Sequence, residues 1–126
     1  MSKKRKTTKN FRTKHPREIG KFYNINDNKG GHPGKVFYAN PEEDVYFIVK
    51  FSTKPRKDRI PLLHSIDPNK EHDQFVVKHP IESDYDGMEY KEKYSSFRVH
   101  PDDIATVKAI EEKYLREKKK WHLRVA

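Results

Sequence analysis

The segment GGHPGKVFYANPEEDVYFIVKFST, residues 30–53, decides the fold predicted for this chain. It opens as a glycine-rich loop, and two runs rich in β-branched and aromatic residues follow, at 35–38 and 45–51. The residues between the runs, 40–44, are of the kinds that form a hairpin turn. Apolar side chains occur on both faces of the two runs, so we expect one face in the core and the other covered by a further element.

The rest of the chain predicts one small β domain closed by a helix. Its 126 residues suit a single domain, and charged residues (37%) outnumber hydrophobic ones (33%), so the core must be small. Pro101 and the two carboxylates after it predict a helix at about 101–120. Its apolar stripe consists of Ile104, Val107, Ile110 and Tyr114. Further strands are expected at 21–25, 60–66, 74–78 and 94–99.

Basic residues are concentrated at the two ends of the chain, whose net charge is +9. Residues 1–21 hold nine Lys or Arg against one acidic residue, and a second basic group lies at 116–126. We expect a disordered, flexible basic arm at 1–21, the β domain at 22–115 and a basic tail at 116–126. Such segments bind nucleic-acid phosphates, because each neutralised phosphate releases counterions. A solvated tail that only keeps the protein soluble is the alternative.

The residues predicted to contact nucleic acid fall into three groups. Those of the arm are Lys3, Lys4, Arg5, Lys6, Arg12, Lys14 and Arg17. Those of the β domain are Lys35, Lys54, Arg56, Lys57 and Arg59. Those of the tail are Lys118, Lys119 and Lys120. We expect the nucleic acid to be RNA, with DNA as the alternative.

Residue types that are missing exclude several kinds of chemistry. The chain has no cysteine, which excludes disulfides, a thiolate nucleophile and Cys-ligated zinc, and which fits a cytoplasmic protein. No apolar run approaches the roughly 18 residues of a membrane span, and no nucleotide-binding glycine motif occurs, so we expect no membrane contact and no cofactor. His64, Asp67, Glu71, His72 and Asp73 are close in sequence but irregularly spaced, and we predict no metal site.

The motifs of residues 30–53 resemble the MazF/PemK/Kid family of toxin endoribonucleases. The resemblance rests on Gly-His-Pro before one strand and on Ser52-Thr53 at the end of the next, followed by further strands and a helix. It implies an SH3-like (PemK-like) barrel, mainly β with a C-terminal α-helix. It also implies metal-free RNA cleavage, a homodimer and an antitoxin partner. The family carries Arg-Pro where this chain has His32-Pro33, so its catalytic arginine is replaced by histidine.

Carried onto this chain, the resemblance predicts His32, Ser52 and Thr53 as the catalytic residues. Histidine exchanges protons near neutral pH, which suits His32 to be the acid or base of RNA cleavage. Ser52 would position the phosphate, and Lys54 or Arg56 would balance its charge. In the alternative interpretation, His32-Pro33 shapes a turn and Ser52-Thr53 caps a strand.

Three functions follow from these observations. The leading prediction is a PemK-like endoribonuclease of the toxin–antitoxin kind. The first alternative is a protein of a phage or mobile element that binds nucleic acid or a nucleoprotein complex without cleaving it. The second alternative is a protein-binding module that uses an acidic stretch at 82–92, which we expect to be a long surface loop.

Overall fold

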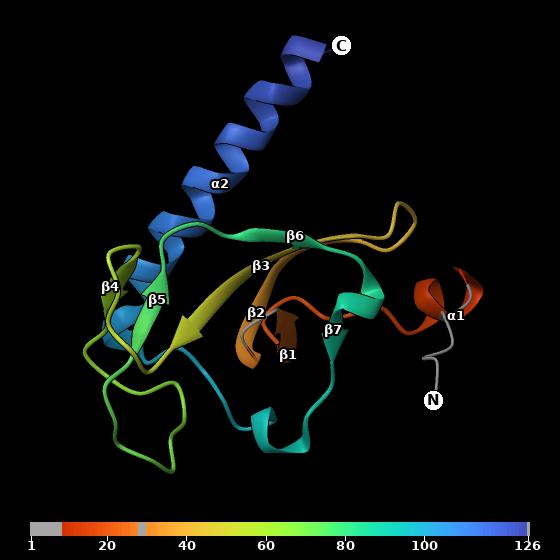
Figure 1. Cartoon of the computed structure of the whole chain (residues 1–126). Helices are drawn as coiled ribbons and strands as arrows, with labels where there is room; N and C mark the ends of the chain where they lie inside the picture. Colours follow the sequence, from red (N-terminus) through yellow and green to blue (C-terminus); the bar gives the residue numbers. More distant parts are fainter. Residues whose placement is uncertain (1–8, 28–29, 126) are drawn as a thin grey trace.

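The computed structural model describes residues 9–27 and 30–125, and places a bent antiparallel sheet beside one long helix (Figure 1). The elements in chain order are α1 (Lys9–Lys14), β1 (Phe22–Asp27), β2 (Gly30–Asn40), β3 (Val45–Ser52), β4 (Arg59–Pro61), β5 (Phe75–Val77), β6 (Ile81–Ser83), the 3-10 helix η1 (Tyr85–Gly87), β7 (Met88–Glu89), the 3-10 helices η2 (Glu92–Tyr94) and η3 (Pro101–Asp103), and α2 (Ile104–Val125). No helix of the described ranges is long and apolar enough to cross a membrane.

Strand β3 is the centre of the sheet. It pairs with β2 along one side, and along the other with β6 at 46–48 and with β5 at 51–52. The full order is β4-β5-β3-β2-β1-β7, with all pairs antiparallel. The prediction of a mainly β chain with a C-terminal helix is confirmed. Within the described residues β4 and β7 end the series without pairing to each other, so the sheet does not close into the expected barrel.

Both faces of β3 are buried, as its sequence pattern predicts. Tyr46 and Ile48 belong to one core cluster, which β1, β2 and the η1–β7 segment complete. Val49 and Phe51 belong to a second cluster, which Val107 of α2 joins. This two-sided burial follows from the strand period, which sends neighbouring side chains to opposite faces.

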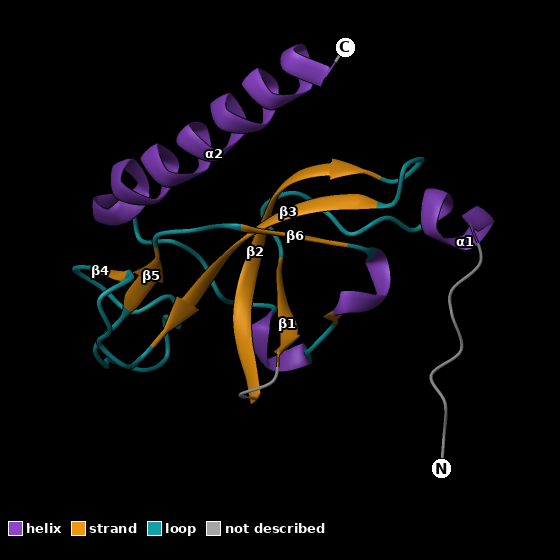
Figure 2. Cartoon of the chain, turned by 45° about the horizontal axis from the view of Figure 1, so that its top comes forward, coloured by secondary structure: helices purple, strands orange, loops and turns teal. Residues whose placement is uncertain are grey.

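Helix α2 packs on the sheet through its first turns. His100 caps η3, because its ring accepts a hydrogen bond from the Asp102 backbone N–H. Val107 is 1% exposed, and Tyr114 meets the Phe47 ring edge-on at 5.0 Å. Three of the four stripe residues thus face the sheet, whereas Ile104 is 49% exposed. The helix continues to Val125 and extends past the sheet, so the segment expected as a tail is helical (Figure 2).

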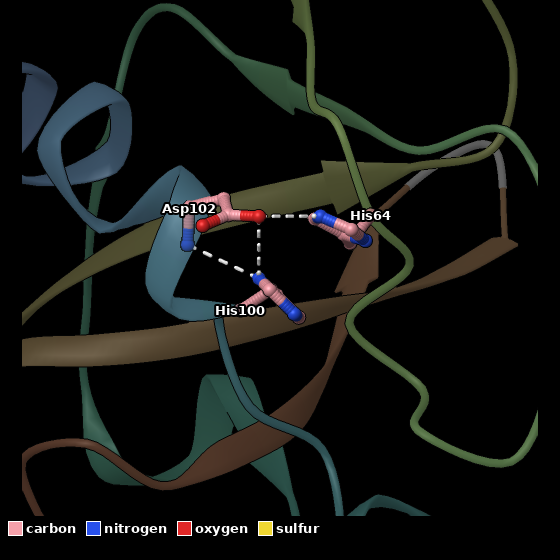
Figure 3. A group of neighbouring side chains, drawn as sticks. All are labelled: His64, His100 and Asp102. Atoms are coloured by element: carbon pink, nitrogen blue, oxygen red, sulfur yellow. Dashed lines mark hydrogen bonds and ion pairs between the residues drawn. The ribbon is translucent and has the colours of Figure 1, made fainter.

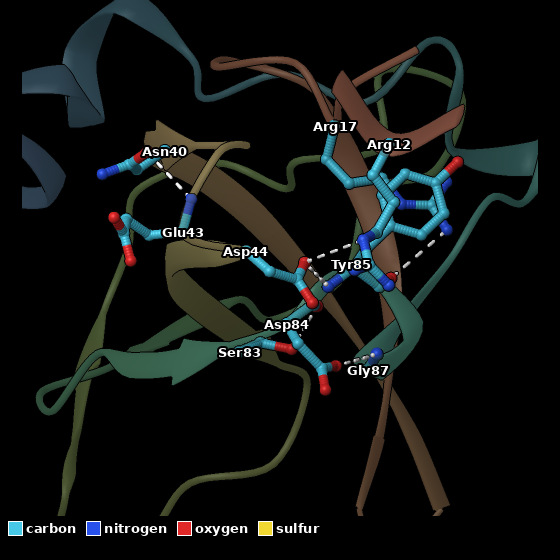
Figure 4. Close-up of polar contacts among 9 residues, drawn as sticks. All are labelled: Arg12, Arg17, Asn40, Glu43, Asp44, Ser83, Asp84, Tyr85 and Gly87. Atoms are coloured by element: carbon cyan, nitrogen blue, oxygen red, sulfur yellow. Dashed lines mark hydrogen bonds and ion pairs between the residues drawn. The ribbon is translucent and has the colours of Figure 1, made fainter. Parts of the chain in front are cut away.

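The described part of the N-terminal arm is ordered, in contrast to the expected disorder through residue 21. After α1, the Arg17 guanidinium lies over the Tyr85 ring, 3.8 Å from its centroid (Figure 4). It also donates to the Met88 carbonyl at 2.8 Å. Arg12 lies 3.8 Å from the Asp44 carboxylate. Basic residues of the arm are therefore used to attach it to the β domain. Residues 1–8 lie outside the described ranges.

The acidic stretch at 82–92 is not a long loop. It contains the end of β6, all of η1 and β7, and the start of η2. Tyr85 and Met88, which lie between its acidic residues, are buried in the core and hold the segment to the sheet. Asp84 caps η1 by accepting from the Gly87 backbone N–H at 2.8 Å (Figure 4).

Two expected strands also differ from the structure. The segment 94–99 forms no strand, because local turn bonds such as Phe97 N–H to the Tyr94 carbonyl (3.0 Å) occupy its backbone. The strand expected at 60–66 is limited to β4, whereas those at 21–25 and 74–78 correspond to β1 and β5. The expected strands and turn of 35–51 are present as the β2–β3 hairpin.

Candidate nucleic-acid cleft

An open cleft of about 1010 Å³ lies where the start of β2, the end of β3, the 53–59 turn and the 92–97 segment meet. Six of the residues predicted from the sequence to act on RNA line it: His32, Ser52, Thr53, Lys54, Arg56 and Arg59. They come from three separate parts of the fold. The sheet therefore gathers most of the predicted body residues in one place.

His32 lies in a strand and not in a loop. The glycine-rich segment from residue 30 onward belongs to β2, where His32 pairs with Ile25 of β1 and Pro33 pairs with Asn24. The interpretation of His32-Pro33 as a turn is therefore wrong. Its position in the β1–β2 ladder fixes the backbone of His32, and the half-buried side chain reaches the cleft.

Ser52 is held by Arg59 at the end of β3. Its Oγ accepts a hydrogen bond from Arg59 Nη1 at 2.6 Å and another from the Lys54 backbone N–H at 3.2 Å. The same Nη1 donates to the Lys54 carbonyl at 2.8 Å, so the turn at 53–58 is closed around the guanidinium. The Arg59 side chain is 15% exposed, and Asp58 lies 3.8 Å from its Nε. A guanidinium is thus fixed beside the predicted hydroxyl.

Gln74 fixes the opposite wall of the cleft, and sequence reasoning missed it. Its Nε2 donates to the Ser52 carbonyl at 3.0 Å, and its Oε1 accepts from the Ile66 backbone N–H at 3.1 Å. The side chain is 3% exposed. One buried amide therefore ties the 62–74 loop to the end of β3. The sequence signal was faint: a lone glutamine before a short apolar run.

A second imidazole, that of His72, also lines the cleft. Its Nδ1 lies 2.9 Å from the Asp73 carbonyl oxygen, which can only accept, so Nδ1 carries the proton. Its Nε2 then accepts from the Ser65 hydroxyl at 3.1 Å. The sequence placed His72 among weak metal candidates, because its approach to the cleft depends on how the 62–74 loop folds back.

The lining of the cleft is mildly basic, with an aromatic floor. Five basic side chains line it against three acidic ones: Lys54, Arg56, Arg59, Lys70 and Lys93, with Asp58, Asp67 and Glu92. Tyr94 and Phe97 contribute aromatic surface, their ring centroids 4.7 Å apart. Burial raises the pKa of the Tyr94 hydroxyl above its ordinary value of 10.0.

The other described basic residues that were predicted to contact nucleic acid do not line the cleft. Lys35 points to α2, where its Nζ lies 2.9 Å from the Glu111 carboxylate. Lys118 lies 3.6 Å from the Glu82 carboxylate, near the Tyr114 ring. Lys14, Lys57 and Lys119 are exposed. Outside the structural description are Lys3, Lys4, Arg5 and Lys6, and the side chain of Lys120.

Comparisons with family models, with curated proteins and with solved structures found no match to this chain. The resemblance to the MazF/PemK/Kid toxins thus stays a prediction that rests on the residues of the 30–53 segment. What the cleft can do is argued below from its own side chains.

Proposed function

We propose that this protein binds single-stranded RNA in the cleft and cleaves it without a metal ion. The observation that carries the proposal is the meeting of His32, Ser52 and Arg59 with a second histidine, His72, in one cleft. His32 and Ser52 stand at the positions that the resemblance to toxin endoribonucleases singles out, and Arg59 was predicted as a nucleic-acid contact.

The two imidazoles supply the proton transfers that RNA cleavage needs. One neutral imidazole takes the proton of a ribose 2′-hydroxyl, and the 2′-oxygen attacks the adjacent phosphorus. The bond from phosphorus to the 5′-oxygen breaks, and a protonated imidazole gives that oxygen its proton. The products are a 2′,3′-cyclic phosphate and a free 5′-hydroxyl. His32 and His72 share these two roles, since imidazole exchanges protons near neutral pH.

Arg59 stands in for the arginine that the family carries at the position of His32. A guanidinium has five N–H donors in a planar fork that suits phosphate oxygens. Two hydrogen bonds from Nη1 hold it against Ser52 and Lys54, which orients the group without using all its donors. Charge that develops on the scissile phosphate is stabilised by such a preorganised group. Lys54 and Arg56, which line the same wall, add to the positive field.

The test is cleavage of a labelled single-stranded RNA in EDTA by wild type, His32→Ala and His79→Ala. His79 is exposed and lies outside the cleft lining, so its variant is the matched control. We expect the wild type and His79→Ala to produce 2′,3′-cyclic ends and His32→Ala to lose about 100-fold or more in rate. The same sequence as DNA, which lacks the 2′-hydroxyl, should stay intact. Equal cleavage by His32→Ala and wild type would overturn the proposed role of His32.

Binding without cleavage is the second candidate, and the occupied hydroxyl of Ser52 favours it. That oxygen already accepts two hydrogen bonds, which suits a structural role at the end of β3. In this case the RNA would be shifted on a gel but intact, with affinity that falls as salt rises. Deleting residues 1–8 removes Lys3, Lys4, Arg5 and Lys6 and spares α1, so the slope of log affinity against log salt should flatten by about 3. An antitoxin, a homodimer and a cytoplasmic location remain predictions from the sequence.

A further inference from the structure

We propose that His64, His100 and Asp102 form a binding site for one divalent transition-metal ion of the zinc type. Each offers one ligand atom, and the three atoms all lie within 4.8 Å of one another (Figure 3). None of the three lines the RNA cleft, so the site is separate from the proposed function. The donor set of two imidazoles and one carboxylate is the kind that binds zinc with a coordination position left open.

Two of the three distances between the ligand atoms are close to those of a metal centre. His64 Nε2 lies 2.9 Å from Asp102 Oδ2, and His100 Nδ1 lies 3.6 Å from the same oxygen. Bonds of about 2.0–2.1 Å in tetrahedral geometry place two ligand atoms ~3.3 Å apart. One distance must lengthen and the other shorten by a few tenths of an ångström. Small rotations of the side chains are enough for this change.

The backbone brings the three residues together before any ion binds. The Asp103 carboxylate, 2% exposed, accepts the backbone N–H groups of Leu63 at 2.8 Å and His64 at 3.0 Å. This clamp holds the loop after β4 against η3, which contains Asp102 and has His100 as its N-cap. The two imidazole rings are already stacked, 3.6 Å between centroids (Figure 3). The three side chains are therefore held close together before any ion binds. Contacts behind the ligands orient them in the same way in metal centres.

The hydrogen bonding of the three groups also leaves a place for a cation. His100 Nδ1 accepts from the Asp102 backbone N–H at 3.1 Å, so this nitrogen carries a lone pair and no proton. That lone pair and the carboxylate oxygen 3.6 Å away are both acceptors. A cation between them replaces this repulsion with two bonds, at the cost of the Asp102 N–H contact. The proton that His64 Nε2 shares with Asp102 would have to leave that nitrogen for an ion to bind there.

Partial exposure makes the site accessible and sets its strength. The side chains of His64, His100 and Asp102 are 35%, 38% and 59% exposed. An ion can enter from solvent, and water fills the remaining position. Three partly exposed ligands bind more weakly than the closed four-ligand sites of structural zinc. The bound ion would link the loop after β4 to the start of α2.

The test is titration of the full, untagged chain with Zn²⁺ by calorimetry, and with Co²⁺ by visible absorption. We expect one ion per chain, visible ligand-field bands with Co²⁺, and a higher melting temperature in the presence of Zn²⁺. His64→Ala and Asp102→Asn should each weaken binding at least about tenfold. Loss of the His64 ring in His64→Ala can disturb the loop itself. Asp102→Asn keeps the shape of the side chain, so it tests the ligand without that disturbance. His79→Ala, an exposed histidine outside the cluster, is the matched control and should bind as the wild type does.

Three results would overturn the site: no saturable binding, equal binding by wild type, His64→Ala and Asp102→Asn, or an equal loss in His79→Ala. The outcome does not depend on RNA cleavage. The proposed cleavage is measured in EDTA, and the metal titration contains no RNA, so either proposal can fail while the other stands.

Discussion

Asp103 is the only charged side chain among the fully buried ones of the described residues, and it shows how one residue can fix a distant loop. It follows Pro101 and Asp102 in the first turns of the C-terminal helical segment, where carboxylates are expected to offset the positive helix end. Its two oxygens instead accept the backbone N–H groups of Leu63 and His64, some forty residues earlier. The positive end of the helix accounts for a carboxylate at position 103. The two hydrogen bonds from the loop account for the burial of that carboxylate.

Replacing this carboxylate should unfold the protein more easily. Asp103→Ala leaves two N–H groups without their acceptor, and each such loss costs about 1–3 kcal/mol. We expect the free energy of unfolding to fall by about 2–5 kcal/mol in urea titrations at pH 7. Glu112→Ala, an exposed site on the same helix, should change it by less than about 0.5 kcal/mol. Equal urea midpoints for the two variants would show that the clamp contributes little.

At the scale of elements, the N-terminal segment is attached to the sheet by its own basic residues. Arg17 stacks on Tyr85 and donates to the Met88 carbonyl, which joins the segment before β1 to η1 and β7. Composition alone predicts a mobile arm, because it counts the charges and not the acceptors that the fold presents to them.

Removal of the Arg17 guanidinium should release this segment while the sheet stays folded. A cation–π contact of about 0.5–2 kcal/mol and a hydrogen bond of about 1 kcal/mol would be lost. In Arg17→Ala we expect hydrogen exchange at residues 9–21 to speed up by about tenfold or more, with little change in β3. Lys14→Ala, at an exposed position in α1, should exchange as the wild type does. Unchanged protection in Arg17→Ala would mean that other contacts hold the segment.

The elements that local pattern predicts well are the β2–β3 hairpin and helix α2. Both elements have long runs of periodic apolar residues. In both, the buried side chains lie at the spacing expected for a strand or a helix. Strands β4, β6 and β7 have two or three residues each, so their partners, and not their own sequences, make them strands. The 94–99 run shows the converse: its aromatic residues are buried by turns rather than by a strand.

The candidate sites also contain some groupings that the sequence predicts and others that only the fold reveals. His32, Ser52 and the basic residues of the 53–59 turn could be predicted to lie together, because they flank one hairpin. The bond from Arg59 to Ser52 could not, since it depends on the closure of that turn. Sequence proximity grouped His64 with residues 67–73, whereas the fold places it against His100 and Asp102. No spacing rule links positions so far apart when the segment between them contains several strands.

At the scale of the whole molecule, buried tyrosines make the core sensitive to high pH. Burial is the largest influence on the hydroxyls of Tyr23, Tyr46 and Tyr94, and it raises the pKa of each above the ordinary 10.0. The folded chain therefore holds these protons more tightly than the unfolded chain does. The resulting stabilisation is fully present below about pH 10 and is lost as the pH rises through the raised pKa values.

We expect the urea midpoint to be flat between pH 8 and about pH 9.5 and to fall steeply above pH 10. Tyr94→Phe removes one of the three ionising groups, so its midpoint should fall less steeply in that range. Tyr38→Phe is the comparison, because Tyr38 belongs to neither core cluster. The urea midpoint is measured by circular dichroism. A midpoint that stayed constant up to pH 11 would contradict the proposed effect of the buried tyrosines.

The central position of β3 has a consequence for how the chain is made. The β1–β3 segment leaves the ribosome before β5, β6 and β7, so β3 must wait for β5 and β6, and β1 must wait for β7 at residues 88–89. The loop after β4 gains its clamp only when Asp103 has been synthesised. During translation β3 is therefore exposed for several seconds at usual elongation rates of roughly 5–20 residues per second. We expect nascent chains that stop before residue 88 to leave the edges of β1 and β3 unpaired and so to be prone to aggregation.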